Sequence, residues 1–231
     1  QQSGNFVDGT VDALRFFFST TAKPYVPGGW SRADVSAARA QGEMSLNWTN
    51  PLAALLDRER LGLAGHSAGA GAVTAVQQCS DAGTLWKTEE ICLGQSFPIK
   101  AIVGWDGVST RNVTPVVPAM TQQADGYFLN PMPSYSAPDP SAHLAVMKAW
   151  TAKNLDNYSL TVRGGTHMEW VDVPYILPST TYGVKMNDRF TLAWFQRYVS
   201  ADAAVREKAV APVGPVAPCG PCGPCAPVEP C

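Results

Sequence analysis

A serine flanked by glycines in Gly65-His66-Ser67-Ala68-Gly69 has surroundings that favour chemistry at its hydroxyl. The apolar segment Arg60–Ala64 precedes the motif, and the small, helix-compatible residues Ala70–Val76 follow it. A strand, a sharp turn at the serine and a helix form a nucleophile elbow, with the hydroxyl near a helix N-terminus. We therefore interpret Ser67 as a nucleophile rather than part of a chance glycine-rich turn. Both motif glycines are expected to be required, because strand and helix approach too closely for side chains.

A serine hydroxyl needs a base, normally an imidazole oriented by a carboxylate. The chain has three histidines. His66 lies within the elbow, where its direction makes it a poor acceptor for the Ser67 proton, and His143 opens a predicted helix as a surface or cap residue. His167 follows a predicted strand in a Gly-Gly loop, where an acid–base group can reach over the sheet. We assign His167 as the base.

Two aspartates at the ends of predicted strands are candidates for the orienting carboxylate. Asp125 gives the chain order Ser67, Asp125, His167, and its strand is expected beside the one that feeds His167. Asp106 ends the preceding strand at the same edge of the sheet. We favour Asp125 and retain Asp106 as the alternative, with the other carboxylate expected to cap a loop.

Alternating strands and helices are needed to place these side chains at one edge. Apolar segments predict strands at Arg60–Ala64, Ile99–Asp106, Val116–Gln122 and Tyr158–Arg163. Helices are predicted at Phe6–Ser19, Arg32–Gln41, Ala70–Val76 and Pro140–Leu155, a short turn or helix at Pro51–Leu56, and a terminal helix capped by Asp188. This alternation predicts an α/β fold built from βαβ units with a parallel sheet.

The composition is that of a globular α/β protein. Of 231 residues, 45% are hydrophobic and 16% are charged, and the net charge is −2, which gives no electrostatic footprint for nucleic acid or anionic membranes. No apolar run reaches the roughly 18 residues of a membrane-spanning helix. We expect residues 1–210 to form the domain and residues 211–231, rich in Pro, Gly and Cys, to be a disordered tail. The spacing of the tail's cysteines does not favour a metal or iron–sulfur site.

The ordered motifs resemble the α/β-hydrolase family, in its esterase/lipase branch with dienelactone-hydrolase-like and cutinase-like polyester hydrolases. The matching segments are the elbow, Ala101–Asp106, Pro118–Asp125 and Gly164–His167, within a region from Leu61 to about Val199. The resemblance implies a carboxylic ester hydrolase that works through an acyl-enzyme, on small or polymeric esters and without metal or organic cofactor. A peptidase or acyltransferase with the same triad, and a truncated or inactive hydrolase-like domain, remain the alternatives.

The resemblance also implies roles for residues around the elbow. The backbone N–H of Ala68 would help to hold the oxyanion, and Trp105, Met168 and Trp170 are candidates for an apolar substrate pocket or for core packing. Glu169 forms a His-x-Glu pair with His167, but without a second nearby histidine a zinc site is not expected.

Two cysteines outside the tail, Cys79 and Cys92, flank a polar loop 13 residues apart. We favour a local disulfide over two free thiols, in keeping with the extracellular location expected of a secreted hydrolase.

The resemblance further implies that the strands preceding the elbow strand are missing, together with one oxyanion donor. Loss of one such donor costs about 2.7–4 kcal/mol of transition-state stabilisation. We expect four parallel strands in sequential order with the elbow strand at an open edge. An open edge predicts low solubility, weak folding or dimerisation through that edge, with low esterase activity.

Overall fold

The computed structural model describes residues 2–26, 37, 40–41, 49–83, 91–108, 113–125, 141–171 and 181–210. Four parallel strands form one sheet in the order β1-β2-β3-β4, with bounds Leu61–His66, Ile99–Trp105, Ala119–Ala124 and Asn157–Val162. The helices are α1 (Gln2–Phe17), α3 (Ala68–Val76), α5 (Ser141–Thr151), α6 (Thr181–Val199) and α7 (Ala203–Val210), with short 3-10 turns η1 (Ala53–Leu55) and η2 (Gln77–Cys79). The predicted α/β class and sequential strand order are confirmed.

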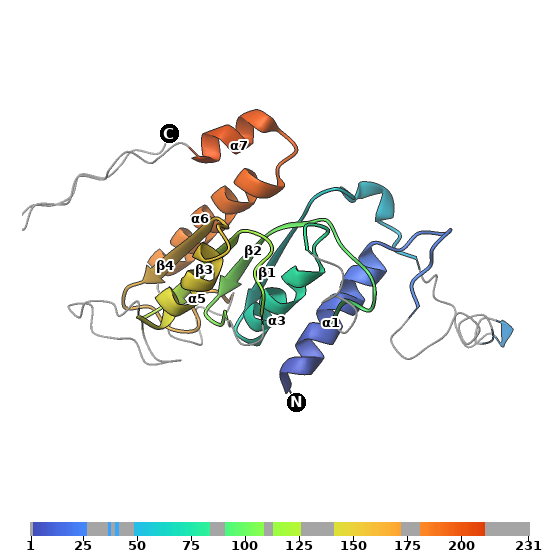
Figure 1. The fold of residues 1–231 in the computed structure, drawn as a ribbon, viewed down its shortest axis with the longest axis horizontal. Coiled ribbons are helices and arrows are strands. Elements are labelled where there is room, and N and C mark those ends of the chain that lie inside the picture. The colour runs from blue at the N-terminus through green and yellow to red at the C-terminus, as the bar shows by residue number, and fades with distance from the viewer. Residues whose placement is uncertain are drawn as a thin grey trace, which may run out of the picture.

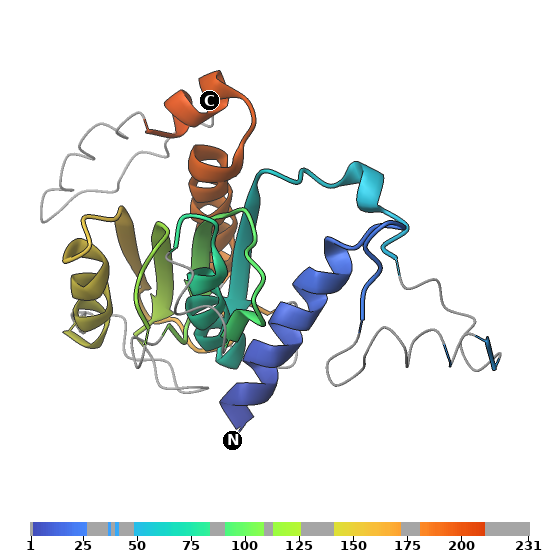
Figure 2. The same ribbon diagram turned by 45° about the vertical axis from the view of Figure 1, so that its right-hand side comes forward.

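Helices cover both faces of the sheet (Figures 1 and 2). On one face, α1, α3 and α5 pack around a core that includes Val11, Val76, Ile102 and Trp150. On the other face, Trp194 of α6 packs on Ala101, Val103 and Met120.

Close packing of α6 depends on a glycine in the elbow strand. A Cβ at Gly62 would lie 2.6 Å from the ring of Phe195. The absence of a side chain at Gly62 therefore brings α6 directly against β1.

Strand β3 begins later than predicted, at Ala119 instead of Val116. The backbone N–H groups of Val116 and Val117 donate to the side-chain oxygen of Gln77 and are therefore unavailable to a strand ladder. Pro118 has no N–H to donate. Local side-chain competition for the backbone thus sets the start of this strand.

The predicted helix cap at Asp188 is wrong. Asp188 lies inside α6, which begins at Thr181, because the residues before it, such as Lys185 and Met186, are themselves good helix formers. Helix α7 was not predicted. The predicted helix at Arg32–Gln41 lies almost entirely outside the described residues, as does the tail at residues 211–231.

Within the described residues, β1 pairs only with β2, so the elbow strand lies at an edge of the sheet as predicted. An apolar cavity of about 330 Å³ lies beside it, lined by residues that include Leu14, Leu55, Leu61 and Leu63. Leu55 itself is 80% exposed. The unpaired edge is therefore bordered by apolar side chains.

A disulfide joins Cys79, at the end of η2, to Cys92, and the Cα atoms are 5.5 Å apart. Both cysteines are completely buried in the core beside α1 and α3. The predicted pairing is confirmed. Across the described ranges, no helix combines the length and apolar character needed to cross a membrane.

Candidate active site

Ser67 lies in a strained turn between β1 and α3. Its backbone adopts φ 57° and ψ −121°, a region that non-glycine residues rarely occupy. The N–H of Ser67 donates to the carbonyl of Trp105 at 2.8 Å, which fixes the turn to the end of β2. The strand, strained serine and helix expected from the motif are all present.

The two glycines of the motif are not equivalent. A Cβ at Gly65 would lie 2.2 Å from the backbone oxygen of Gly69, whereas a Cβ at Gly69 would meet nothing within 4 Å. The expectation that both glycines are sterically required is wrong for Gly69, because a side chain at this position would point into open space. Gly107, which follows β2, is a further constraint: a Cβ there would lie 2.2 Å from the carbonyl oxygen of Ser67.

His167 is paired with Asp106. The Nδ1 atom of His167 lies 2.5 Å from Oδ2 of Asp106, and both side chains are largely buried. Asp106 has a φ of 49°, so the chain bends sharply after β2, and its Oδ1 accepts the N–H of Ala124 at 3.2 Å. The carboxylate is thereby fixed between the end of β3 and the imidazole.

The preference for Asp125 as the partner of His167 is therefore wrong in geometry. Asp125 follows β3 directly, and its Oδ1 accepts the N–H of Gly164 at 2.7 Å. Gly164 has a φ of +71°, in the left-handed region that favours glycine. Asp125 thus holds the turn that leads from β4 to His167, and it is the carboxylate with the loop-capping role.

A feature that sequence reasoning passed over is the Asp-Gly pair after β2. Because Gly107 must lie against Ser67, the preceding Asp106 is held next to the elbow. The expected adjacency of strands favoured Asp125 as the partner of His167. The close approach of Gly107 to Ser67 indicates the partner better, because it holds Asp106 next to the elbow.

His66, which immediately precedes Ser67, contacts His167 directly. Its Nε2 lies 2.8 Å from the backbone oxygen of His167, and the two ring centroids are 4.5 Å apart. Burial lowers the pKa of His66 below its ordinary value, and the nearby His167 imidazole acts in the same direction. The prediction that His66 is not the base is consistent with this arrangement, but its contact with His167 was not foreseen.

The candidate substrate residues differ in exposure. Trp170 is 8% exposed, packs with Ala124 and Val162, and donates its Nε1–H to Gln122 at 3.3 Å. Trp105 is partly buried beside both Trp170 and α6, and its Nε1–H donates to Thr191 at 3.3 Å. Met168 is partly exposed next to His167. Trp170 is thus a core residue, and substrate contact by any of the three remains a prediction.

The first residue of α3, Ala68, is exposed. Its N–H donates no hydrogen bond to another backbone group among the described residues. The first N–H groups of a helix have no partner within the helix and can bind an anion. The position of Ala68 is thus compatible with its predicted role.

Glu169 is almost completely buried and accepts the N–H of Thr166 at 3.4 Å. No group of three His, Cys, Asp or Glu side chains in the described part of the chain is arranged to hold a metal ion.

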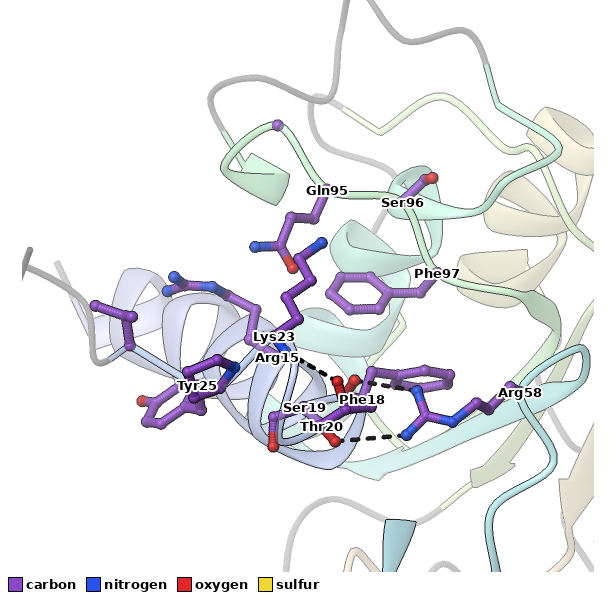
Figure 3. Close-up of a pocket in the computed structure, with 13 residues that line it drawn as sticks. Arg15, Phe18, Ser19, Thr20, Lys23, Tyr25, Arg58, Gln95, Ser96 and Phe97 are labelled. Carbon is purple, nitrogen blue, oxygen red and sulfur yellow. Dashed lines mark hydrogen bonds between the residues drawn. The ribbon is translucent and has the colours of Figure 1, made fainter. Parts of the chain in front are cut away.

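A larger cavity, of about 700 Å³, lies near the amino ends of β1 and β2 (Figure 3). Its lining includes the cationic residues Arg15, Lys23 and Arg58. Arg58 donates to the carbonyls of Phe18 and Ser19 at 3.1 and 3.4 Å, beyond the end of α1. This cavity lies at the opposite end of the strands from Ser67.

No protein-family model and no curated protein sequence matches this chain. Among solved structures, the fold is similar to the carboxylesterase Cest-2923 from Lactobacillus plantarum WCFS1, with 16% identity and a TM-score of 0.47 over 74% of this chain and 67% of that one. A putative carboxylesterase from the same organism gives 17% identity and a TM-score of 0.39 over 73% of this chain and 66% of that one. The chain thus spans about two thirds of each of these structures.

Proposed function

We propose that this protein hydrolyses carboxylic esters with Ser67, His167 and Asp106 as a catalytic triad. The observation that carries the proposal is the 2.5 Å contact between His167 and Asp106 beside the strained turn of Ser67. A largely buried carboxylate–imidazole pair next to a strained serine is the arrangement that activates a hydroxyl nucleophile.

The hydrogen bond to Asp106 gives the two imidazole nitrogens of His167 different roles. Its Nδ1–H donates to Asp106, which leaves Nε2 as the proton acceptor. Nε2 takes the Ser67 proton as Oγ attacks the ester carbonyl, and it returns that proton to the alcohol as the acyl-enzyme forms. Water then attacks the acyl-enzyme with His167 again as base, and the acid product is released.

The negative charge of the tetrahedral intermediate needs hydrogen-bond donors near Ser67. The N–H of Ala68, an exposed residue at the start of α3, is one such donor, and the positive end of the helix adds to it. Met168 and Trp105 are the proposed apolar contacts of the ester, because both are partly accessible and lie next to the triad in sequence.

We also propose that the protein acts outside the cell. A buried disulfide between Cys79 and Cys92 supports an oxidising compartment, since disulfides are rare in reducing cytosol. Detection of the bridge in protein recovered from the culture medium of its source would support this location, and recovery only as reduced cytosolic protein would contradict it.

A fluorophosphonate probe tests the nucleophile directly. We expect one covalent adduct, mapped to Ser67 by mass spectrometry, and hydrolysis of short p-nitrophenyl esters. Ser67→Ala should abolish the adduct and lower the turnover rate at least about 10⁴-fold. Ser159→Ala, at an exposed position on β4, is the matched control and should retain both. An adduct that persists in Ser67→Ala would overturn the assignment.

Among the strands that the structure describes, β1 has a neighbour on one side alone, which favours one rival: a hydrolase-like domain without catalysis. Stoichiometric labelling of Ser67 without release of product would support that rival. Hydrolysis of a matched anilide, or transfer of the acyl group to an added alcohol in preference to water, would instead favour a peptidase or acyltransferase.

A further inference from the structure

We propose that His66 is a positioning residue that sets the distance between the nucleophile and its base, by holding the backbone of His167. The inference rests on the proposed function, since it concerns how Ser67 and His167 are held at a fixed position relative to each other. It adds a residue that belongs neither to the triad nor to the oxyanion donors.

The contact has a defined direction. The backbone carbonyl of His167 can only accept, so Nε2 of His66, 2.8 Å away, carries the proton and donates it. In the neutral ring of His66 the single proton is therefore on Nε2, and Nδ1 carries none. Burial disfavours the charged imidazole and lowers the pKa of His66, and this effect outweighs the opposing effect of the hydrogen bond to His167.

The ring of His66 lies close to two other rings. Its centroid lies 4.5 Å from that of His167 and 6.2 Å from that of Trp170, whose indole is anchored to Gln122. His66 is also the last residue of β1, so its backbone belongs to the sheet. The donor is therefore fixed from both its backbone and its ring.

This arrangement gives a short connection between the two reacting groups. His66 and Ser67 are joined by a peptide bond, and one hydrogen bond joins His66 to His167. The start of the loop that leads to His167 is held by Asp125 through Gly164, and the imidazole of His167 is held by Asp106. Each of these three connections acts on a different atom of the loop, and the His66 contact is the one that joins the carbonyl of His167 to the elbow.

A neutral His66 also matters electrostatically. During attack by Ser67, His167 becomes an imidazolium, and a second cation at a ring distance of 4.5 Å would oppose that charge. Asp106 is the negative group that acts on both rings. A neutral donor at position 66 holds the loop without competing for that carboxylate.

A pair of amide variants isolates the hydrogen bond. In His66→Gln, the amide N–H can reach about as far as the imidazole Nε2–H, whereas in His66→Asn it is one methylene shorter. Both variants lose the ring and the titratable group, so they differ mainly in reach. A tenfold change in rate corresponds to about 1.4 kcal/mol, which lies within the range for one net hydrogen bond.

We expect His66→Asn to lower kcat for a p-nitrophenyl ester about tenfold, with KM changed by less than about twofold. His66→Gln should recover kcat to within about threefold of the wild-type protein. Equal kcat values for the two variants would overturn the proposal, as would loss confined to KM. Melting temperatures of both variants, measured alongside, ensure that folded protein is compared.

NMR of the His167 ring separates failure of this inference from failure of the proposed function. With histidine labelled, only three residues contribute signals. His66→Asn should broaden the His167 ring signals through exchange between positions, and His66→Gln should restore sharp signals. If Ser67→Ala retained activity, the proposed function would fail while this readout still reported on the contact. Sharp, unshifted His167 signals in His66→Asn would contradict the positioning role itself.

Discussion

The two ends of the sheet differ in how their polar groups are arranged. At the carboxyl ends of the strands, Asp106, His167 and His66 come from separate segments and contact one another over distances of 2.5–2.8 Å. At the amino ends, Arg15 and Arg58 line the same 700 Å³ cavity, yet each is engaged with its own neighbours. Arg15 pairs with Asp12 at 3.1 Å, and Arg58 binds carbonyls next to α1.

Convergence of polar groups, and not cavity volume, marks the candidate active site. The amino-end cavity is large, but Figure 3 shows Arg15 and Arg58 on opposite sides of it, each directed toward a different part of the chain. Tyr25 at its rim hydrogen-bonds Asp12, and burial raises the pKa of Tyr25 to about 12, so its hydroxyl stays protonated and donates. These interactions join α1 to the following loop.

The largest expected difference in activity is between variants of the two aspartates that end neighbouring strands. Asp106→Asn should lower turnover about 10⁴-fold, because an amide cannot stabilise the imidazolium and favours the wrong tautomer of His167. Asp125→Asn should stay within about threefold of wild type, since its amide oxygen can still accept the N–H of Gly164. Ester hydrolysis by both variants measures the difference.

The reverse order of these effects would return Asp125 to the role of triad acid. Comparable losses in both variants, with intact folding, would mean that neither pairing alone orients His167. Circular dichroism of each variant provides the folding control.

The motif glycines give the next largest contrast. Gly65→Ala should destabilise the fold by about 1–3 kcal/mol, because the new Cβ would overlap the backbone of Gly69. Gly69→Ala should be neutral or stabilising by about 0.4–1 kcal/mol, since it meets no atom within 4 Å and lies in a helix. Urea unfolding of the two variants provides both free energies. Equal destabilisation would show that the turn does not bring strand and helix as close as described.

Prediction from sequence succeeded where one short pattern determines the local geometry. The elbow could be placed because a strand, Ser67 and small helical residues follow one another, and the sheet order followed from alternating elements. His167 was located by its glycine-rich loop after β4. These features depend mainly on neighbours in the chain.

Prediction failed where distant backbone groups compete. Two carboxylates end adjacent strands, and the choice between Asp106 and Asp125 depends on which N–H groups face each, Ala124 for one and Gly164 for the other. Likewise, the start of β3 depends on Gln77, which belongs to η2. Such contacts between segments are set by tertiary packing, which periodicity and spacing do not encode.

The smallest expected effect tests the amino end of the sheet. Arg58→Gln removes the guanidinium that binds the carbonyls of Phe18 and Ser19. The free energy of unfolding should therefore fall by about 0.5–1.5 kcal/mol. Turnover should stay within about twofold, because this end carries none of the groups proposed for catalysis. Lys153→Gln, an exposed change of the same charge elsewhere, is the matched control and should alter neither quantity. A large loss of kcat in Arg58→Gln with unchanged stability would overturn the division between the two ends, since it would mean that the cavity near α1 participates in the reaction.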